Sequence, residues 1–278
     1  MPAMTFELRL PRPVTPPLLA PLATLARRRV QLTARRPREL LVPLTMPILF
    51  ALVIAPALAR ALHAGSRYES FVAVGSIGLL IPVNAMFSAI SVIVDREHGA
   101  QRELLTAPIA RSLLPLSNLA VALMLGALQI GAVLLAALTR GIHFDTSGRG
   151  IVWFVATAFL LTTGMYGLAE IVAARVHGQE EYVARIPPVA IVPWFLAGSL
   201  FPITAMPGFL TWITRFLPLT HALALMRYGL LGDRTGLRNI WQLGNTTGMA
   251  ALSLAVVALF AVLVTTASIR VFTHSALR

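Results

Sequence analysis

The sequence contains no cysteine and no lysine, and charged residues make up only 12% of its 278 residues. The absence of cysteine excludes disulfides, thiolate nucleophiles and metal sites built on cysteine. The absence of lysine excludes an intact phosphate-binding loop ending in Gly-Lys-Ser or Gly-Lys-Thr, because that loop needs the lysine ammonium group against the nucleotide phosphates. If ATP drives the work of this protein, a different polypeptide therefore hydrolyses it.

Hydrophobic residues account for 57% of the chain. A soluble domain carries about 25% charged residues, so this composition indicates a polytopic membrane protein. All 23 basic residues are arginine, and the formal net charge is +12. In a membrane protein this charge favours anionic lipid at a cytoplasmic membrane face as the counterpart, rather than nucleic acid.

Residues 1–40 form a basic segment with eight arginines and seven prolines, and they lack the apolar core of a cleavable signal peptide. Within this segment, residues 18–38 place most leucines on one side of a helical wheel and most arginines on the other. We therefore predict a helix that lies in the headgroup region on the cytoplasmic side. The alternative is a disordered basic tail. Arg29 and Arg36 depart from the pattern, because both fall within the apolar half.

The rest of the chain contains apolar segments long enough to cross a bilayer, since about 20 helical residues cover roughly 30 Å of hydrocarbon. The predicted fold is therefore an all-α polytopic membrane protein with six transmembrane helices in one domain, residues 41–278. A short polar link, residues 65–70, is expected between the first two spans. The spans are predicted near 41–62, 71–94, 113–139, 151–174, 187–204 and 246–269.

One apolar stretch does not fit a simple span. No residue between Ile186 and Thr214 is charged, and the apolar character continues to Gly232, which is too long for one helix and too apolar for an aqueous loop. Proline and glycine at positions 202, 207 and 208 break it into pieces. We predict that residues 205–232 form a re-entrant outer hairpin of two short helices between spans five and six. The second helix is expected to start at Pro218 and to end near Gly229 or Gly232.

The distribution of arginine predicts the orientation in the membrane. Six spans place both termini on one side, and the predicted topology puts 15 arginines on that side against 8 on the other. The positive-inside rule then assigns both termini to the cytoplasm. The arginines between positions 215 and 238 remain outside and are an exception to the rule.

Two ionisable residues lie in apolar surroundings. Glu170 is about one helical turn before the end of the fourth predicted span, so we interpret it as a paired or snorkelling residue at the cytoplasmic boundary. A charge at mid-bilayer would cost about 2.5–3.5 kcal/mol, and the alternative role is proton coupling. His221 is interpreted as a hydrogen-bonded residue of the outer hairpin rather than a metal ligand, because the six histidines are scattered.

A charged segment, residues 95–112, separates the second and third predicted spans. It contains Glu97-His98-Gly99, then Glu103-Leu104-Leu105, then Pro108-Ile109 and Arg111. In these residues the sequence resembles the permease subunits of type-2 ABC exporters, which include daunorubicin-resistance-type and nodulation-type exporters. The resemblance implies that the segment is a cytoplasmic coupling helix that seats in a groove of a separate ATPase subunit. The residues implied in this contact are Arg96, Glu97, Gly99, Arg102, Glu103, Leu104, Leu105, Pro108 and Arg111.

A second block resembles the outer re-entrant hairpin of the same family. It comprises residues 198–203, 206–209, 217–223 and 227–232, and with the first block the resemblance covers nearly the whole chain from Leu41. The resemblance implies that this hairpin gates the exit of the transport path. The residues implied in the outer gate are Phe201, Pro202, Pro207, Pro218 and Arg227.

The resemblance implies a permease subunit that moves a hydrophobic or amphipathic cargo, such as a drug, antibiotic, lipid or glycolipid, across the bacterial cytoplasmic membrane and out of the cytoplasm or inner leaflet. ATP and Mg²⁺ are expected on the ATPase partner, and this chain is expected to hold no cofactor, metal or catalytic residue. Because six spans supply half a pathway, a second permease copy is expected, identical or a sister chain. No nucleic-acid partner is expected.

Two other classes of protein remain as alternatives. A proton-coupled secondary multidrug transporter usually needs ionisable groups near the midplane and repeated halves, and here Glu170 is the one candidate and no internal repeat is visible. A membrane-embedded enzyme needs a grouped set of catalytic side chains. The spans show neither paired carboxylates nor a His-Glu-x-x-His motif.

Overall fold

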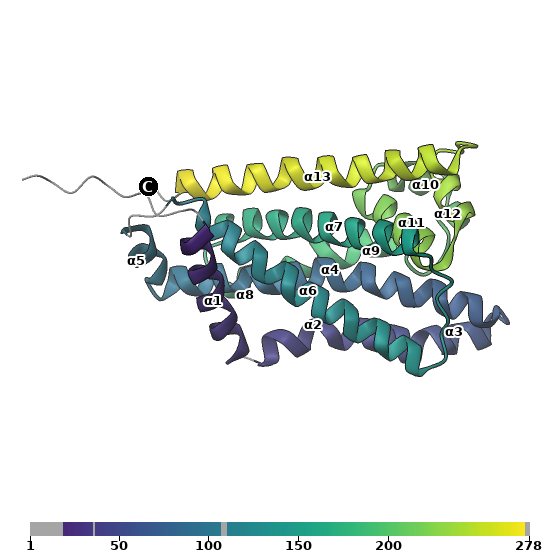
Figure 1. Cartoon of the computed structure of the whole chain (residues 1–278), viewed down its shortest axis with the longest axis horizontal. Helices are drawn as coiled ribbons and strands as arrows, with labels where there is room; N and C mark the ends of the chain where they lie inside the picture. Colours follow the sequence, from purple (N-terminus) through teal and green to yellow (C-terminus); the bar gives the residue numbers. More distant parts are fainter. Residues whose placement is uncertain (1–18, 36, 107–109, 276–278) are drawn as a thin grey trace, which may run out of the picture.

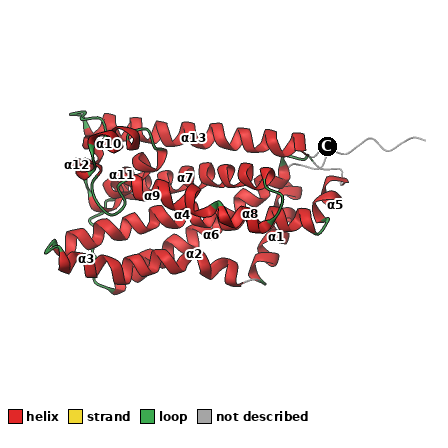
Figure 2. Cartoon of the chain, turned by 180° about the vertical axis from the view of Figure 1, so that it is seen from behind, coloured by secondary structure: helices red, strands yellow, loops and turns green. Residues whose placement is uncertain are grey.

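The computed structural model describes residues 19–35, 37–106 and 110–275, and throughout this part of the chain the regular elements are all helices (Figures 1 and 2). The long helices run along the longest axis of the molecule. One end carries α5 (Ala100–Thr106) and the other carries α12 (Arg234–Asn239), and we call these the α5 end and the α12 end. Helix α1 (Leu19–Ala34) and the C-terminal end of α13 (Thr246–Ser275) both lie at the α5 end. The all-α prediction is confirmed.

Five stretches of the described chain are long and apolar enough to cross a membrane, so the protein is a multi-pass membrane protein. They become six if the bent pair α10 and α11 counts as one span. The five comprise Leu41–Ala61, which runs through α2 (Pro37–Leu49) and α3 (Ala55–Ala61), then α4 (Gly65–Glu97), α6 (Leu113–Thr139), α7 (Gly148–Arg175) and most of α13.

Helix α4 is the centre of the bundle. In its most apolar window 78% of the residues are buried, compared with 28% in α13. It packs against α2, α3, α6, α7 and α11, while α7 packs on α4, α11 and α13. A helix that is apolar all round is one that other helices surround, whereas α13, with Leu259, Val262 and Leu263 exposed, presents an apolar outer face to the bilayer or to another chain.

Two helical segments each contain one π-helical turn, and a proline follows shortly after each turn. Between α2 and α3, the N–H of Ala55 donates to the carbonyl of Phe50 directly before Pro56. In the turn Pro187–Ile191, the N–H of Val192 donates to the carbonyl of Pro187 directly before Pro193. Because proline has no N–H, it cannot continue the regular ladder, and a π turn lets the helix proceed without a sharp kink.

The prediction of a fifth span over 187–204 is not confirmed, because no candidate span of the described chain covers these residues, and its bounds differ from those of the helices. The helical path starts earlier, with α8 (Gln179–Ala184), and ends at Leu196 with α9 (Val192–Leu196). The chain leaves helical geometry at Gly198, whose φ of +79° is in the left-handed region that favours glycine. Composition did not reveal this break, because no charged residue and no proline lies between Leu196 and Phe201.

The predicted polar link at residues 65–70 is also wrong, because these residues form the first turns of α4. The turn that precedes them is short and ends at Gly65, with φ +69°. Polar side chains do not stop a helix, and at about 1.5 Å per residue the 33 residues of α4 extend over roughly 50 Å, which is longer than the hydrocarbon layer.

After the 3₁₀ turn Ile203–Ala205, two short helices follow, as predicted for residues 205–232. Helix α10 (Gly208–Thr214) and α11 (Pro218–Leu231) meet at 82°. The bend arises at Leu217, which is extended (ψ 124°) because the following proline disfavours helical geometry. Pro218 lies in the first turn of α11, and Gly232 ends the helix in the left-handed conformation, so both predicted boundaries are confirmed.

Gly75 in α4 allows a close approach between this helix and the chain that follows α9. A Cβ atom at Gly75 would lie 2.3 Å from the carbonyl oxygen of Ser199. We therefore expect Gly75→Ala to lower the free energy of unfolding by about 1–3 kcal/mol through overpacking. The measurement is thermal unfolding in detergent.

The matched control is Gly131→Ala in α6, where a Cβ would meet nothing within 4 Å. This substitution is expected to be neutral or slightly stabilising, since alanine has the higher helix propensity. Equal melting temperatures for the two variants would contradict the close approach of α4 to Ser199.

Candidate functional site

Two regions carry the residues predicted to be functional. The coupling region is the segment 95–112, whose described residues, 95–106 and 110–112, lie at the α5 end, and the outer segment, residues 197–232, lies at the α12 end. Helix α4 connects them, because it begins beside the outer segment and ends in the coupling region (Figure 1).

A glycine turn separates α4 from α5. Helix α4 ends at Glu97, His98 caps it, and Gly99 follows with φ +77°. A glycine in this conformation is the common way to end a helix. Gly99 is required here for its backbone conformation, because a Cβ at this position would meet nothing within 4 Å.

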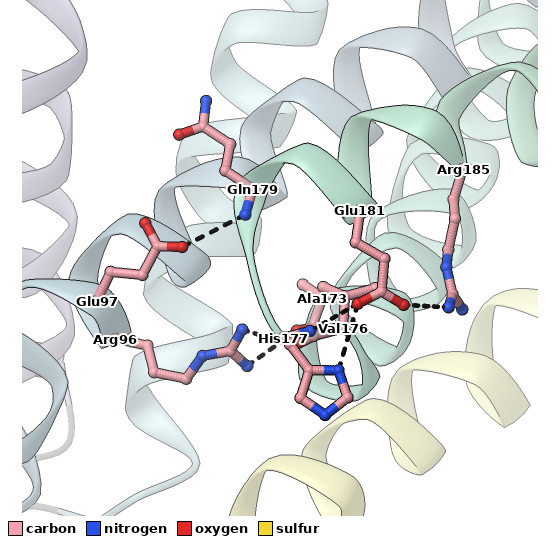
Figure 3. Close-up of polar contacts among 8 residues, drawn as sticks. All are labelled: Arg96, Glu97, Ala173, Val176, His177, Gln179, Glu181 and Arg185. Atoms are coloured by element: carbon pink, nitrogen blue, oxygen red, sulfur yellow. Dashed lines mark hydrogen bonds and ion pairs between the residues drawn. The ribbon is translucent and has the colours of Figure 1, made fainter.

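Arg96 and Glu97 connect the end of α4 to the loop between α7 and α8 (Figure 3). The guanidinium group of Arg96 donates to the carbonyls of Ala173 (3.1 Å) and Val176 (2.8 Å), which are among the last carbonyls of α7. The carboxylate of Glu97 accepts the N–H of Gln179 (3.3 Å) at the start of α8. A cation at a helix C-terminus and an anion at a helix N-terminus are both favourable, so these residues bind within their own chain.

The α7–α8 loop is held internally by Glu181 (Figure 3). Its carboxylate accepts the backbone N–H of His177 (2.9 Å) and forms an ion pair with Arg185. The hydrogen bond from the His177 N–H is the main cause that lowers the pKa of the Glu181 carboxyl. The loop that receives Arg96 and Glu97 is therefore itself ordered.

Helix α1 is attached to the coupling region by a partly buried ion pair. Arg29 of α1 lies 3.2 Å from the carboxylate of Asp95, and its Nε donates to the side-chain oxygen of Asn118 in α6 (3.0 Å). The Arg29 side chain is only 8% exposed. Arg28 also approaches Asp95, at 4.0 Å, but is more exposed. One arginine thus joins α1, α4 and α6.

The remaining predicted coupling residues lie in or next to α5, and the structure describes only some of their side chains. Glu103 is exposed and forms no ion pair in the part of the chain that is described, while Leu104 and Arg111 are half-buried. Arg102 and Leu105 belong to α5, but their side chains are outside the description. Pro108 lies outside the described residues.

Arg227 of α11 is the central side chain of the outer segment. It is 5% exposed, and its guanidinium group donates to the carbonyls of Gly198 (2.8 Å), Ser199 (2.7 Å) and Phe71 (3.3 Å). It also lies over the ring of Phe71, 3.4 Å from the centroid. The predicted gate residue is therefore a fixed link between α11, α4 and the chain after α9.

Two aromatic side chains complete the hydrogen bonding around this break. The Tyr68 hydroxyl donates to the carbonyl of Leu200 (2.9 Å), and the Trp194 indole N–H donates to the carbonyl of Gly75 (2.7 Å). Consecutive carbonyls from Gly198 to Leu200 thus have side-chain donors. This matters because non-helical backbone at membrane depth is tolerated only where its polar groups are satisfied.

The other predicted gate residues lie at the boundaries of the short elements. Pro202 precedes the 3₁₀ turn, Pro207 precedes α10 and Pro218 begins α11. Phe201 is 42% exposed. The three prolines lie where the path of the chain changes, whereas Arg227 holds the segment by hydrogen bonds.

Both ionisable residues in apolar surroundings have partners. Glu170 is buried; one carboxylate oxygen accepts the hydroxyl of Ser268 in α13, and the other has no hydrogen-bond partner among the described residues. Its interpretation as a residue of the cytoplasmic boundary stays a prediction. His221 is buried between the carbonyl of Arg215 and the hydroxyl of Ser253, at 2.9 Å each. Because a carbonyl only accepts, Nε2 carries the proton and Nδ1 of the neutral ring accepts from Ser253. The prediction of a hydrogen-bonded histidine is confirmed.

Some residues of these regions were missed from the sequence. Arg29 gave a signal, because an arginine on the apolar side of an amphipathic helix needs a buried partner. Asp95 is the partner, but nothing local links positions 29 and 95. The donors Tyr68 and Trp194 gave no signal, since aromatic residues are common in any membrane protein.

Comparison with known proteins agrees with the resemblance. The family model described as ABC-2 type transporter matches residues 21–231. A "Putative transport permease ycf38" of Porphyra purpurea is 27% identical over 199 residues, which cover 70% of this chain and 68% of that protein. "Nodulation protein J" of Sinorhizobium fredii is 25% identical over 201 residues, which cover 72% of this chain and 71% of that protein.

The contacts of Arg227 predict a large effect of its removal. Arg227→Met leaves the buried carbonyls of Gly198 and Ser199 without their donor, and an unsatisfied buried group costs about 1–3 kcal/mol. We expect a lower melting temperature in detergent. The control is Arg149→Met, at an exposed arginine of the same end, which is expected to melt like the wild type. A wild-type melting temperature for Arg227→Met would show that other donors replace the guanidinium group.

The ion pair of Arg29 predicts that α1 is released when it is broken. Asp95→Asn removes a charge-assisted contact that contributes about 2 kcal/mol, so trypsin should cleave at the arginines of α1 roughly 30-fold faster if cleavage follows the open population. Adding Arg29→Gln should increase cleavage by less than Arg29→Gln does alone, because both substitutions remove the same ion pair and only the hydrogen bond to Asn118 is lost in addition. Glu103→Gln serves as the control, and additive effects of the first two substitutions would refute the pairing.

Proposed function

Because the chain belongs to the ABC-2 type transporter family, we propose that it is the membrane permease subunit of an ATP-driven exporter and that a separate ATPase subunit powers it. The observation that carries this proposal is the construction of the coupling region. A short helix, α5, projects at one end of the bundle, and polar contacts tie the chain on its N-terminal side to α1, α6 and α7. In this proposal, a movement of α5 with the ATPase is transmitted to the membrane-spanning helices.

The contacts divide the coupling region into two functional parts. Arg96, Glu97 and Asp95 bind within the chain and make the end of α4 rigid. Glu103 is exposed on α5 and is available for the ATPase. We therefore assign the ATPase contact to α5, with Leu104 and Leu105 as its apolar anchor, and the transmission to the residues of α4. Exposed ion pairs of this kind set orientation more than affinity.

The chain contains no lysine, so in this proposal the phosphate-binding loop, with its ATP and Mg²⁺, is on the partner. When two ATPase subunits close on ATP, α5 moves with them and shifts α4 and α6 as connected bodies. A second permease copy, identical or a sister chain, supplies the other half of the pathway. The apolar residues exposed on α6, α7 and α13 provide the surface for lipid and for that copy.

The proposed cargo is hydrophobic or amphipathic, and it leaves at the α12 end through the outer segment. The proposed location is the bacterial cytoplasmic membrane with the α5 end in the cytoplasm. The observations that support this orientation are the arginines of α1 and the position of α1 and the α13 C-terminus at the same end.

Co-purification tests the proposal. The tagged chain is expressed with its neighbouring genes and purified in detergent, and we expect an ATPase to co-purify in stoichiometric amount. Glu103→Arg should reduce its recovery and ATPase activity several-fold without changing the melting temperature of the permease, because Glu103 has no partner among the described residues. Glu97→Ala should lower both, because Glu97 caps α8.

The control for charge reversal is Arg149→Glu, at an exposed position of the α12 end, which should leave recovery of the ATPase unchanged. If no ATPase co-purifies with the wild type, or if Glu103→Arg and Arg149→Glu behave alike, the assignment of the coupling region fails.

A further inference from the structure

A cavity of about 680 Å³ opens at the α12 end, in the range of small-molecule sites. Its walls come from four parts of the chain: the start of α4, the loop between α6 and α7, the outer segment, and α12 with the turn before it. Arg227 and Phe71 contribute to the lining. The cavity therefore depends on the same contacts that hold the outer segment in place.

The lining carries charges of both signs in equal number. Arg67, Arg227 and Arg234 contribute three guanidinium groups, and Glu69, Asp145 and Asp233 contribute three carboxylates. Arg227 is occupied by backbone carbonyls, and Asp233 accepts the N–H of Gly236 (2.9 Å).

The other four charged groups have no such contacts. Across the described residues, Arg67, Glu69, Asp145 and Arg234 form no ion pair within 4.0 Å with one another or with any other side chain. Opposite charges that share a cavity without pairing are available to a ligand.

A second feature points to an occupant. The hydroxyl of Thr220, a residue of the lining that is 2% exposed, has no hydrogen-bond partner. Buried hydroxyls are normally paired. The lining also includes apolar side chains, those of Ile142, Ile203 and Leu231. The lining thus offers sites for a positive charge, for a negative charge and for an aliphatic part.

We propose that this cavity binds the zwitterionic head group of an amphiphile, with the anionic part toward Arg67 and Arg234 and the cationic part toward Glu69 and Asp145. An anion alone would face the carboxylates, and a cation alone would face the arginines. The proposal deepens the proposed function, on which it rests for the idea that the ligand is cargo.

Binding is measured on the purified full chain without the ATPase, so that failure of the exporter proposal leaves this test intact. The probe is dihexanoyl phosphatidylethanolamine, and the binding is followed by isothermal titration in a non-ionic detergent. The comparison amphiphiles are dihexanoyl phosphatidylglycerol (anionic), an alkyltrimethylammonium (cationic) and octyl glucoside (neutral). We expect the zwitterion to bind most tightly.

Two substitutions remove one charge of each sign. Asp145→Asn and Arg234→Gln should each weaken binding of the zwitterion about tenfold, since each removes one charge-assisted contact. Asp145→Asn should also improve binding of the anionic lipid, and Arg234→Gln binding of the cationic amphiphile. The control is Arg149→Gln, at an exposed arginine of the same end outside the lining, which should bind the zwitterion like the wild type.

The proposal is overturned if the four amphiphiles bind alike, if the zwitterion does not bind, or if only the arginine or only the carboxylate matters. A further arm separates cargo from resident lipid. If the zwitterion is cargo, it should raise the ATPase activity of the co-purified complex, and Asp145→Asn should reduce that stimulation. Binding without stimulation would assign the cavity to a resident lipid and overturn the cargo role.

Discussion

The structure depends on hydrogen-bond donors for the backbone carbonyls of residues 198–200, where the helical path ends after α9. After α9 the chain turns at Gly198 within an apolar stretch, and the carbonyls that follow have no helical N–H partner and little access to water. Arg227 donates to the carbonyls of Gly198 and Ser199, and Tyr68 donates to that of Leu200. A guanidinium group suits this task because its planar set of donors reaches several acceptors at once. Without these donors, the outer segment would have no stable path.

Polar contacts also hold both ends of α4. Arg227 also donates to the carbonyl of Phe71 and stacks on its ring, while Arg96 at the far end of α4 binds the last carbonyls of α7. One continuous helix of 33 residues is thus fastened at both ends. In the proposed exporter it connects the ATPase contact of α5 with the exit at the α12 end.

The α5 end shows how a basic N-terminal helix is built into a membrane protein. Arg29 lies on the apolar side of α1, where it forms an ion pair with Asp95 and donates a hydrogen bond to Asn118. Removing one partner of such a pair is costly because the other charge stays buried and unpaired, whereas apolar residues in place of both could be equally stable, so the pair serves to specify one arrangement of the helices. Of the three arginines of α1, Arg27 is exposed, Arg28 is half-buried, and Arg29 is buried and fixes the helix on the bundle.

The sequence by itself determined local features, namely most of the long apolar helices and the boundaries of α11. Long apolar runs predicted the spans that became α4, α6, α7 and α13, and Pro218 and Gly232 marked the boundaries of α11, because hydrophobicity, proline and glycine act within a few residues. The tertiary structure decided the rest. It ended the helical path at Leu196, and it placed Arg227, a predicted gate residue, in buried contact with distant backbone carbonyls.

The physical reason is the separation of the partners along the chain. Arg227 and Phe71 are 156 residues apart, and Arg29 and Asn118 are 89 apart. No periodicity in one segment specifies which distant segment provides the acceptor. Charged residues of the 95–112 segment were readily found because they interrupt apolar runs, but only the packed structure shows which of them bind within the chain and which remain exposed.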